Sequence, residues 1–311
     1  MALTSNRFEE FIKKTLTNLK SFFISILLLS LISPLLGVCQ ERLRGIVKST
    51  NSGEIIPYAT IIIIDKRGGT YSDEEGKFEI SITPSDSLTF SSIGFKRITI
   101  SVKEVKTNGG HIYLDPDITQ LESVTIQAKR GRVKPEYKEF GYTKTKRRYL
   151  ISFAIPGVQI ATFIMNDSER EGFIESLLFG ITCERKSRIR IRLYRPTIQN
   201  GVGTEITKQN LIFDVSGNHK RFELNMSKYE VPFGREGIVV AIEFLGEVGK
   251  NDKIKNGTII GTKLYLTDGN DKIRNTWESY RERDFVRESF SDNQRNTSNA
   301  LIGLSAVFYN N

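Results

Sequence analysis

The sequence GIVKSTNSGEIIPYATIIII occupies residues 45–64, and TYSDEEGKFEISI follows at residues 70–82. Both stretches contain β-branched or alternating apolar residues, which favour strands, and both are interrupted by polar turn residues. Within the second stretch, Asp73 is placed to cap a hairpin turn, and Gly76 can supply the positive φ that such a turn requires. Similar segments continue to residue 102 at intervals of about ten residues, a spacing that predicts an antiparallel β-sandwich.

Five motifs in this region follow one another in a fixed order. They are Gly45-x-Val47, Pro57-x-Ala59-x-Ile61, Thr70-x-x-Asp73-x-x-Gly76-x-Phe78, Ile93-Gly94-Phe95 and Leu121-x-x-Val124-x-Ile126-x-Ala128. As a series they resemble the carboxypeptidase-regulatory-like domain, in the version found in TonB-dependent receptors and other exported proteins of the Bacteroidetes. The resemblance covers about residues 43–128 and implies a non-catalytic, prealbumin-like β-sandwich. We therefore expect residues 40–128 to form the first domain.

Two activities that accompany such domains do not suit this chain. A zinc peptidase needs histidine and carboxylate ligands gathered around one metal. The two histidines of the chain, His111 and His219, are far apart and lie in no such motif. A receptor of the TonB-dependent kind needs a much longer second part than residues 129–311. We therefore expect no catalytic residue, no metal site and no cofactor.

An apolar run near the start of the chain predicts export. Residues 22–36 read FFISILLLSLISPLL, a length that suits the hydrophobic region of a signal peptide better than a membrane span. Lysines precede this run, and small residues follow it. We expect residues 1–39 to be a signal peptide that is cleaved before Gln40. Lipidation of Cys39 and an uncleaved anchor are the alternatives. Export places the protein in the periplasm or in association with the outer membrane.

The chain is basic, with a formal net charge of +9, which favours anionic partners such as acidic glycans or lipid head groups. Alternatively, the charge only maintains solubility. Export disfavours nucleic acid as a partner. Positive residues are concentrated from residue 129 onward, and we expect residues 129–138 to be a basic linker. Such a linker suits peripheral association with the outer membrane, or is simply solvated. With two cysteines in the chain no disulfide scaffold is implied, and we expect Cys183 to be buried in a strand.

Residues 139–311 again contain many strand-like segments. Two of them are residues 172–181 (GFIESLLFGI) and residues 187–194 (SRIRIRLY), and the second alternates strictly between arginine and apolar residues. That period of two predicts one apolar face and one arginine face. The order of the segments is similar to that in β-sandwich modules of exported glycan-binding and adhesion-type proteins. We expect a second, jelly-roll-like β-sandwich and an all-β fold for the whole chain.

Candidate ligand-binding residues come from two places in this second domain. Arg188, Arg190 and Arg192 could hold carboxylates or sulfates through paired hydrogen bonds. Alternatively, they lie on an exposed sheet face and pair with acidic residues of the next strand. Trp277 and Tyr280 fall in a polar stretch that is predicted to be a long loop. Their rings could stack on sugars, or they could pin the loop to the core.

We therefore expect an exported, non-catalytic protein of the cell envelope. The first sandwich would act as a spacer or docking module, and the second would bind a glycan or an envelope protein. One alternative is a structural accessory subunit without a ligand. Another is a hydrolase that uses paired carboxylates such as Asp214 and Glu243.

Overall fold

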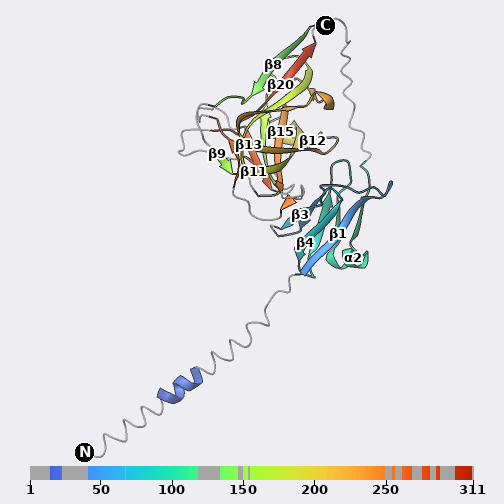
Figure 1. Cartoon of the computed structure of the whole chain (residues 1–311), viewed down its shortest axis with the longest axis vertical. Helices are drawn as coiled ribbons and strands as arrows, with labels where there is room; N and C mark the ends of the chain where they lie inside the picture. The colour runs from blue at the N-terminus through green and yellow to red at the C-terminus, as the bar shows by residue number, and fades with distance from the viewer. Residues whose placement is uncertain are drawn as a thin grey trace, which may run out of the picture.

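A computed structural model shows how these segments are arranged (Figure 1). It describes residues 15–22, 41–66, 68–117, 134–145, 150–152, 155–248, 254–255, 261–267, 275–280, 285–287 and 298–309. Strands predominate, which confirms the all-β prediction. Residues 15–22 are helical, whereas residues 1–14 and 23–39 of the predicted signal peptide lie outside the described residues. No helix within the described ranges has the length and hydropathy of a membrane span.

The N-terminal unit, residues 41–117, contains two small sheets. One has the strand order β4 (Lys77–Ile82), β1 (Glu41–Ser49), β7 (His111–Leu114), and the other has the order β3 (Gly69–Tyr71), β2 (Thr60–Ile63), β5 (Ser87–Ser91), β6 (Ile98–Ser101). Alternate residues of both sheets point into one shared apolar cluster, which includes Val47, Ile61, Phe78 and Phe90. Two sheets around one core make the sandwich that the strand spacing predicted.

The segment at residues 98–102 differs from the prediction of a single strand. Strand β6 ends at Ser101, and helix α2 (Val102–Thr107) begins directly after it. The Ser101 side chain caps this helix by accepting a hydrogen bond from the Glu104 backbone N–H at 3.2 Å. Val102 and Val105, three residues apart, are both buried. The cap and this spacing favour a helical turn over a longer strand.

The turn at residues 73–76 forms as predicted. Asp73 Oδ1 accepts hydrogen bonds from the backbone N–H groups of Glu75 and Lys77, both at 2.9 Å. Gly76 has a φ of +71°. Gly94, in the Ile93-Gly94-Phe95 motif, is required by its backbone conformation and not by a lack of space. An added Cβ at Gly94 would meet no atom within 4 Å, so its φ of +83°, and not a close backbone approach, requires glycine.

The described residues of the C-terminal unit, between 134 and 309, form one curled thirteen-stranded sheet. Its strands are β8 (Pro135–Gly141), β9 (Leu150–Ser152), β10 (Val158–Ile164), β11 (Gly172–Pro196), β12 (Val202–Glu205), β13 (Leu211–Asn225), β14 (Pro232–Phe233), β15 (Ile238–Val248), β16 (Ile254–Lys255), β17 (Thr262–Tyr265), β18 (Thr276–Tyr280), β19 (Val286–Arg287) and β20 (Ile302–Tyr309). A 3₁₀ turn, η2 (Ser227–Tyr229), separates β13 from β14. The finer jelly-roll topology stays a prediction.

Strand β11 is the main departure from the expected strand pattern. The two strands predicted at residues 172–181 and 187–194 are a single strand of 25 residues with register shifts near Phe179 and Cys183. Its first half pairs with β20 and β17, and its second half pairs with β15, while β13 runs beside both halves. The sheet therefore curls, and both halves surround one large apolar core.

Cys183 lies within β11 and is buried, as predicted. Burial raises the pKa of its thiol, although hydrogen bonds with Ser187 and Thr262 act in the opposite direction. The predicted loop at residues 275–290 is wrong in part. Residues 276–280 form β18, which pairs with β10, and residues 286–287 form β19.

Candidate functional site

The second half of β11 has the two faces that its period of two predicted. Ile189, Ile191 and Leu193 belong to the large core. The side chains of Arg188, Arg190 and Arg192 lie on the other face and are 7%, 1% and 7% exposed. The arginine face is therefore buried, and the expectation of an exposed face is wrong. A buried arginine requires partners, because an unpaired charge out of water costs several kcal/mol.

Neighbouring strands of the same sheet supply carboxylates to all three arginines. Arg188 and Asp214 of β13 form a bidentate pair with N–O distances of 2.6 and 3.0 Å. Glu205 of β12 pairs with Arg192 in the same manner, at 2.9 and 2.7 Å. Glu243 of β15 lies 3.5 Å from Arg190 Nη1 and 3.8 Å from Arg192 Nη1. The arginines thus pair with acidic neighbours on adjacent strands, as one of the two sequence interpretations required.

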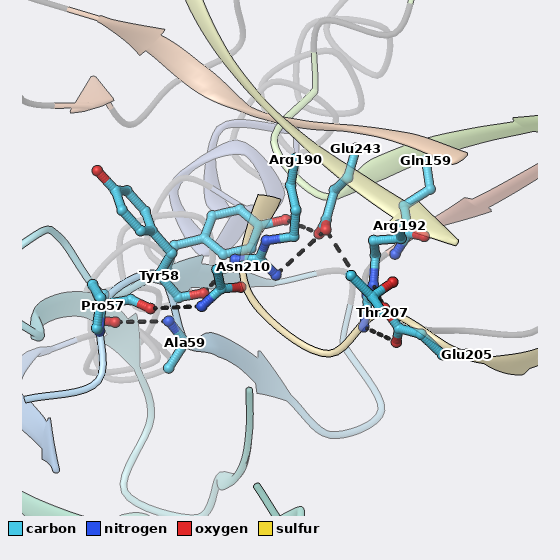
Figure 2. Close-up of polar contacts among 12 residues, drawn as sticks. Pro57, Tyr58, Ala59, Gln159, Arg190, Arg192, Glu205, Thr207, Asn210 and Glu243 are labelled. Atoms are coloured by element: carbon cyan, nitrogen blue, oxygen red, sulfur yellow. Dashed lines mark hydrogen bonds and ion pairs between the residues drawn. The ribbon is translucent and has the colours of Figure 1, made fainter. Parts of the chain in front are cut away.

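The N-terminal unit covers this face through the loop before β2 (Figure 2). Arg190 Nη2 donates to the main-chain carbonyl of Tyr58. Arg188 Nη1 donates to the Tyr58 hydroxyl at 2.5 Å and to Glu74 Oε1 at 2.6 Å. The same hydroxyl donates to Glu74 Oε1 at 2.7 Å. Tyr58, Glu74 and Arg188 therefore all contact one another, although Arg188 is more than a hundred residues from the other two in the chain.

A second tyrosine reaches further into the C-terminal unit. The Tyr71 hydroxyl donates to Glu243 Oε1 at 2.7 Å. Arg190 lies over the Tyr71 ring, with its Cζ 5.7 Å from the ring centre. Tyr58 and Tyr71 also share an apolar cluster with Leu245, against which Ile212 packs. Hydrogen bonds, cation–π contacts and apolar packing therefore coincide at one junction, which we call the arginine junction.

The backbone at Tyr58 is unusual. Its φ is +56°, in the left-handed region that a bulky residue rarely adopts. Tyr58 is nevertheless buried, and Asn210 Nδ2 donates to the preceding carbonyl, that of Pro57, at 3.4 Å. Such a conformation persists where the surrounding contacts hold it. Here those contacts come from both units, since Arg190 binds the Tyr58 carbonyl and the Ser72 hydroxyl accepts from the Ala59 N–H at 2.8 Å.

The electrostatics of the arginine junction follow from burial and pairing. Burial, and then the hydrogen bond to Glu74, raise the pKa of Tyr58 well above its usual value, so the hydroxyl stays protonated and can donate. The hydrogen bonds with Asp214 raise the pKa of Arg188. Burial alone would raise the pKa of Asp214, but hydrogen bonds from Arg188 and Lys186 lower it overall. The Arg188–Asp214 pair therefore remains charged around neutral pH.

Comparison with known families bears on the unit that supplies the two tyrosines. Residues 43–126 match the family model of the CarboxypepD_reg-like domain. This match confirms the family predicted for that segment, whose closing motif at residues 121–128 lies outside the described residues. No curated protein matches the chain. Tyr58 lies within this matched segment, so a loop of the CarboxypepD_reg-like domain makes the contact with the arginine face.

Three buried polar atoms around Glu243 have no hydrogen-bond partner among the described residues: Gln159 Nε2, Arg190 Nε and Glu243 Oε2. Their residues lie in one cross-strand row, because Gln159 is opposite Glu243 and Glu243 is opposite Arg190. Glu243 Oε2 has charge–charge contacts with two guanidinium groups but no closer hydrogen bond. Glu243 Oε2 is therefore stabilised by charge–charge attraction to the two guanidinium groups. Removing either the carboxylate or its nearest arginine would leave an unpaired buried charge.

The structure places the two aromatic candidates on opposite faces of β18. Trp277 is buried and shares a face with Arg192, since it aligns with Ala161, Ala161 with Ala241, and Ala241 with Arg192. Tyr280 aligns with Val158 and packs against the large core. Only Trp277 therefore joins the face that the three arginines occupy. The buried packing of Trp277 agrees with the interpretation in which the aromatics anchor their segment.

The partners that the CarboxypepD_reg-like domain supplies, Tyr58, Tyr71 and Glu74, could not be recognised from the sequence alone. Nothing in the local pattern distinguishes them from ordinary turn and strand residues. Glu243 did carry a signal, because a lone carboxylate inside the apolar run IVVAIEFL implies a buried partner. The carboxylates considered for a hydrolase, Asp214 and Glu243, lie on opposite sides of β11, and each has an arginine partner.

The described residues contain no group of three or more His, Cys, Asp or Glu side chains that could hold a metal ion. His111 is an exposed residue of β7. His219, in β13, contacts the Ser216 carbonyl through Nε2 at 2.8 Å. The contacts at the arginine junction are those of guanidinium groups with carboxylate and carbonyl oxygens, and the protein itself provides those oxygens.

Proposed function

We propose that the chain is an exported, non-catalytic protein of the cell envelope. In this proposal the CarboxypepD_reg-like domain is a docking module held against the C-terminal unit, and the C-terminal unit binds a glycan or an envelope protein. The apolar leader and the basic net charge support export and a partner at the envelope. The partner class remains the one expected from the sequence, and the docking role rests on the structure.

The arginine junction carries the docking part of the proposal. All three arginines bind oxygen atoms of the protein itself. Two of them, Arg188 and Arg190, donate hydrogen bonds to the N-terminal unit. A flexible spacer would not need these buried, directional contacts. The hydrogen bonds of Arg188 and Arg190 to Tyr58 are buried, and buried contacts are screened by salt much less than exposed ones, so this contact between the units should persist across changes in ionic strength. We infer a rigid docked module in preference to a free one.

The docking role can be tested with Arg190. The single change Arg190→Met leaves Glu243 buried without its nearest cation and should cost about 3–5 kcal/mol. The double change Arg190→Met/Glu243→Met removes both charges and should recover most of the folding stability. It still lacks the bond to the Tyr58 carbonyl and the Tyr71 hydrogen bond. We expect the folded double variant to have a larger radius of gyration than the wild type by small-angle scattering.

Arg221→Met is the matched control, because Arg221 pairs with Glu139 on the surface of the C-terminal unit, away from the junction. It should leave both the stability and the radius of gyration close to those of the wild type. A double variant as compact as the wild type would contradict the docking role.

The binding part needs a direct assay. The full chain is applied to a glycan array and used to capture proteins from an envelope extract, with the Arg190→Met/Glu243→Met variant beside it. If the wild type binds a glycan or a protein and the variant binds it more weakly, the result would support binding by a C-terminal unit that depends on the docked CarboxypepD_reg-like domain. Absence of both glycan and protein binding would favour the structural accessory subunit instead.

A further inference from the structure

Strand β8 lies at an edge of the large sheet. Among the described strands it pairs with β20 alone, antiparallel, with Tyr137 opposite Val307 (Figure 1). Pro135, Glu136, Tyr137 and Glu139 are all exposed, and Tyr137 is 58% exposed. An edge strand presents unpaired backbone groups that another strand can use.

The hydrogen-bond pattern shows which residues of β8 point outward. The Tyr142 N–H donates to the Ile302 carbonyl at 3.1 Å, and on the other side of β20 the Gly180 N–H donates to the Leu301 carbonyl at 3.0 Å. Because bonded pairs alternate along an antiparallel ladder, the even-numbered residues of β8 face β20. The N–H and carbonyl groups of Tyr137 and Glu139 therefore point away from the sheet. Pro135, which has no N–H, offers only a carbonyl.

The charges of β8 favour one way of pairing with an identical strand. In a two-fold antiparallel pair centred on Tyr137, each Glu136 lies opposite Lys138 of the other copy, and Tyr137 lies opposite itself. Centring the pair on Lys138 or on Glu139 instead places like charges opposite each other, which is destabilising. Proline and lysine on an edge strand discourage unspecific pairing. In the register centred on Tyr137, Glu136 of one copy neutralises Lys138 of the other. These two residues therefore favour that register over the others.

Both charged residues also have partners within the chain. Glu136 contacts Arg170 at 2.8 Å, and Lys138 contacts Asp167 at 2.9 Å. All four side chains are at least 39% exposed, and such surface pairs are weak and easily shared. They leave the charges of β8 available to a second copy.

An apolar row leads across the sheet to the same edge. Pro232, Phe173, Val307 and Tyr137 align across β14, β11, β20 and β8, and paired residues share one face. Tyr309, which is 42% exposed, lies diagonally next to Tyr137 on that face. Pairing through β8 would continue this row into the row of the second copy and cover the exposed Tyr137 ring.

We propose that β8 is the pairing edge of a symmetric dimer, in which two copies of this chain join antiparallel about Tyr137 to form one continuous sheet. The partner is thus a second copy, which the charge complementarity and the continuation of the apolar row both favour. The dimer is independent of the arginine junction, because β8 and β20 lie at the opposite end of the C-terminal unit from the N-terminal unit (Figure 1).

The register makes the test specific. The mass of the full chain in solution is measured by light scattering over a wide range of concentration. We expect a dimer for the wild type and a monomer for Glu136→Lys, which places lysines opposite each other twice. The charge swap Glu136→Lys/Lys138→Glu should restore the dimer, although it breaks the internal contacts with both Arg170 and Asp167. Tyr113→Lys, which changes an exposed tyrosine on edge strand β7, is the control and should leave the dimer intact.

A cysteine pair tests the same geometry without relying on charge. Tyr137→Cys brings two thiols opposite each other, within the Cα separation that a disulfide allows, and should cross-link under mild oxidation. Glu139→Cys, two residues away on the same edge, should not. A monomeric wild type, a Glu136→Lys dimer, a charge swap that stays monomeric or equal cross-linking by both cysteines would each overturn the proposal. So would an edge that binds only a glycan or another envelope protein.

Discussion

At the scale of single residues, Tyr58 contacts the arginine junction through both its main chain and its side chain. Its carbonyl accepts from Arg190, its hydroxyl lies between Arg188 and Glu74, and its own φ is positive. A residue with three such constraints has little freedom to change. The alternation of arginine and isoleucine in β11 could be predicted from the sequence. The identity of the groups that the arginines contact could not, because Tyr58 is 130 residues from Arg188 and no local pattern links them.

The Tyr58 hydroxyl can be tested by removing it alone. Tyr58→Phe keeps the ring but leaves Arg188 Nη1 with Glu74 only, and hydrogen bonds to charged groups contribute about 1.5–3 kcal/mol. We expect a loss of that order in the free energy of unfolding, measured by chemical denaturation. In a double-mutant cycle with Glu74→Gln the losses should not add, because both groups bind the same guanidinium. Tyr113→Phe, on an exposed edge strand, should have almost no effect, and equal losses at the two tyrosines would contradict the assignment.

Asp214 gives the junction a pH dependence of known sign. Because the pKa of Asp214 is lower in the folded protein than in the unfolded chain, its contribution to stability is fully present above the unfolded value, about 3.9. That contribution is lost as the pH falls through the lower folded value. We therefore expect stability to decrease with falling pH in this range, and to decrease less steeply in Asp214→Asn. The exposed Asp167→Asn serves as the control, and an acid transition as steep in Asp214→Asn as in the wild type would refute the assignment.

At the scale of elements, a structure determined by a few neighbouring residues could be predicted from the sequence, whereas one determined by pairing with distant strands could not. The turn at Asp73 and Gly76 is determined by four residues and forms as predicted. The fusion of two predicted strands into β11 is not local, because the polar residues 184–186 resemble a turn. Pairing with β13 on either side of these residues keeps the strand continuous through a register shift. Tertiary pairing thus overrides the local turn signal.

Two glycines separate the effects of backbone conformation and of space. Gly76 and Gly53 have nearly the same φ, +71° and +70°. A Cβ at Gly76 would lie 2.9 Å from the Val47 carbonyl oxygen, whereas a Cβ at Gly53 would meet nothing within 4 Å. Gly53→Ala should therefore cost about 1–2 kcal/mol from the left-handed conformation alone. Gly76→Ala should cost clearly more, as measured by thermal or denaturant unfolding, and equal costs would show that the close approach is unimportant.

At the scale of the whole molecule, the class of fold was predictable and the relation between its two units was not. Strand spacing and the motif series identify the first sandwich. The closing of its loop over the arginine face depends on side chains from five strands, β3, β11, β12, β13 and β15, and on the turn at Glu74. Sequence patterns report one strand at a time, so a contact of this kind is visible only once the sheets are assembled.

The burial of the junction predicts how the whole molecule responds to salt. Exposed charge pairs weaken at high ionic strength, but the buried hydrogen bonds between the units, from Arg190 to the Tyr58 carbonyl and from Tyr71 to Glu243, are screened much less. We expect the radius of gyration from small-angle scattering to be the same in low and high salt. In the Arg190→Met/Glu243→Met variant it should be larger in both. An opening of the wild type on addition of salt would show that exposed charges, and not the buried junction, hold the two units.

The bond from Arg190 to the Tyr58 carbonyl has a further consequence for how such a protein can diversify. A main-chain oxygen is present whatever residue occupies the position. This hydrogen bond therefore depends on the backbone conformation of the loop and not on the side chain at residue 58. A foreign domain whose loop follows the same left-handed bend would offer the same oxygen to the same guanidinium. A chimera with a related domain in place of residues 41–117 would test this single anchor, whereas the side-chain contacts of Tyr58 and Tyr71 require those residues in the grafted domain.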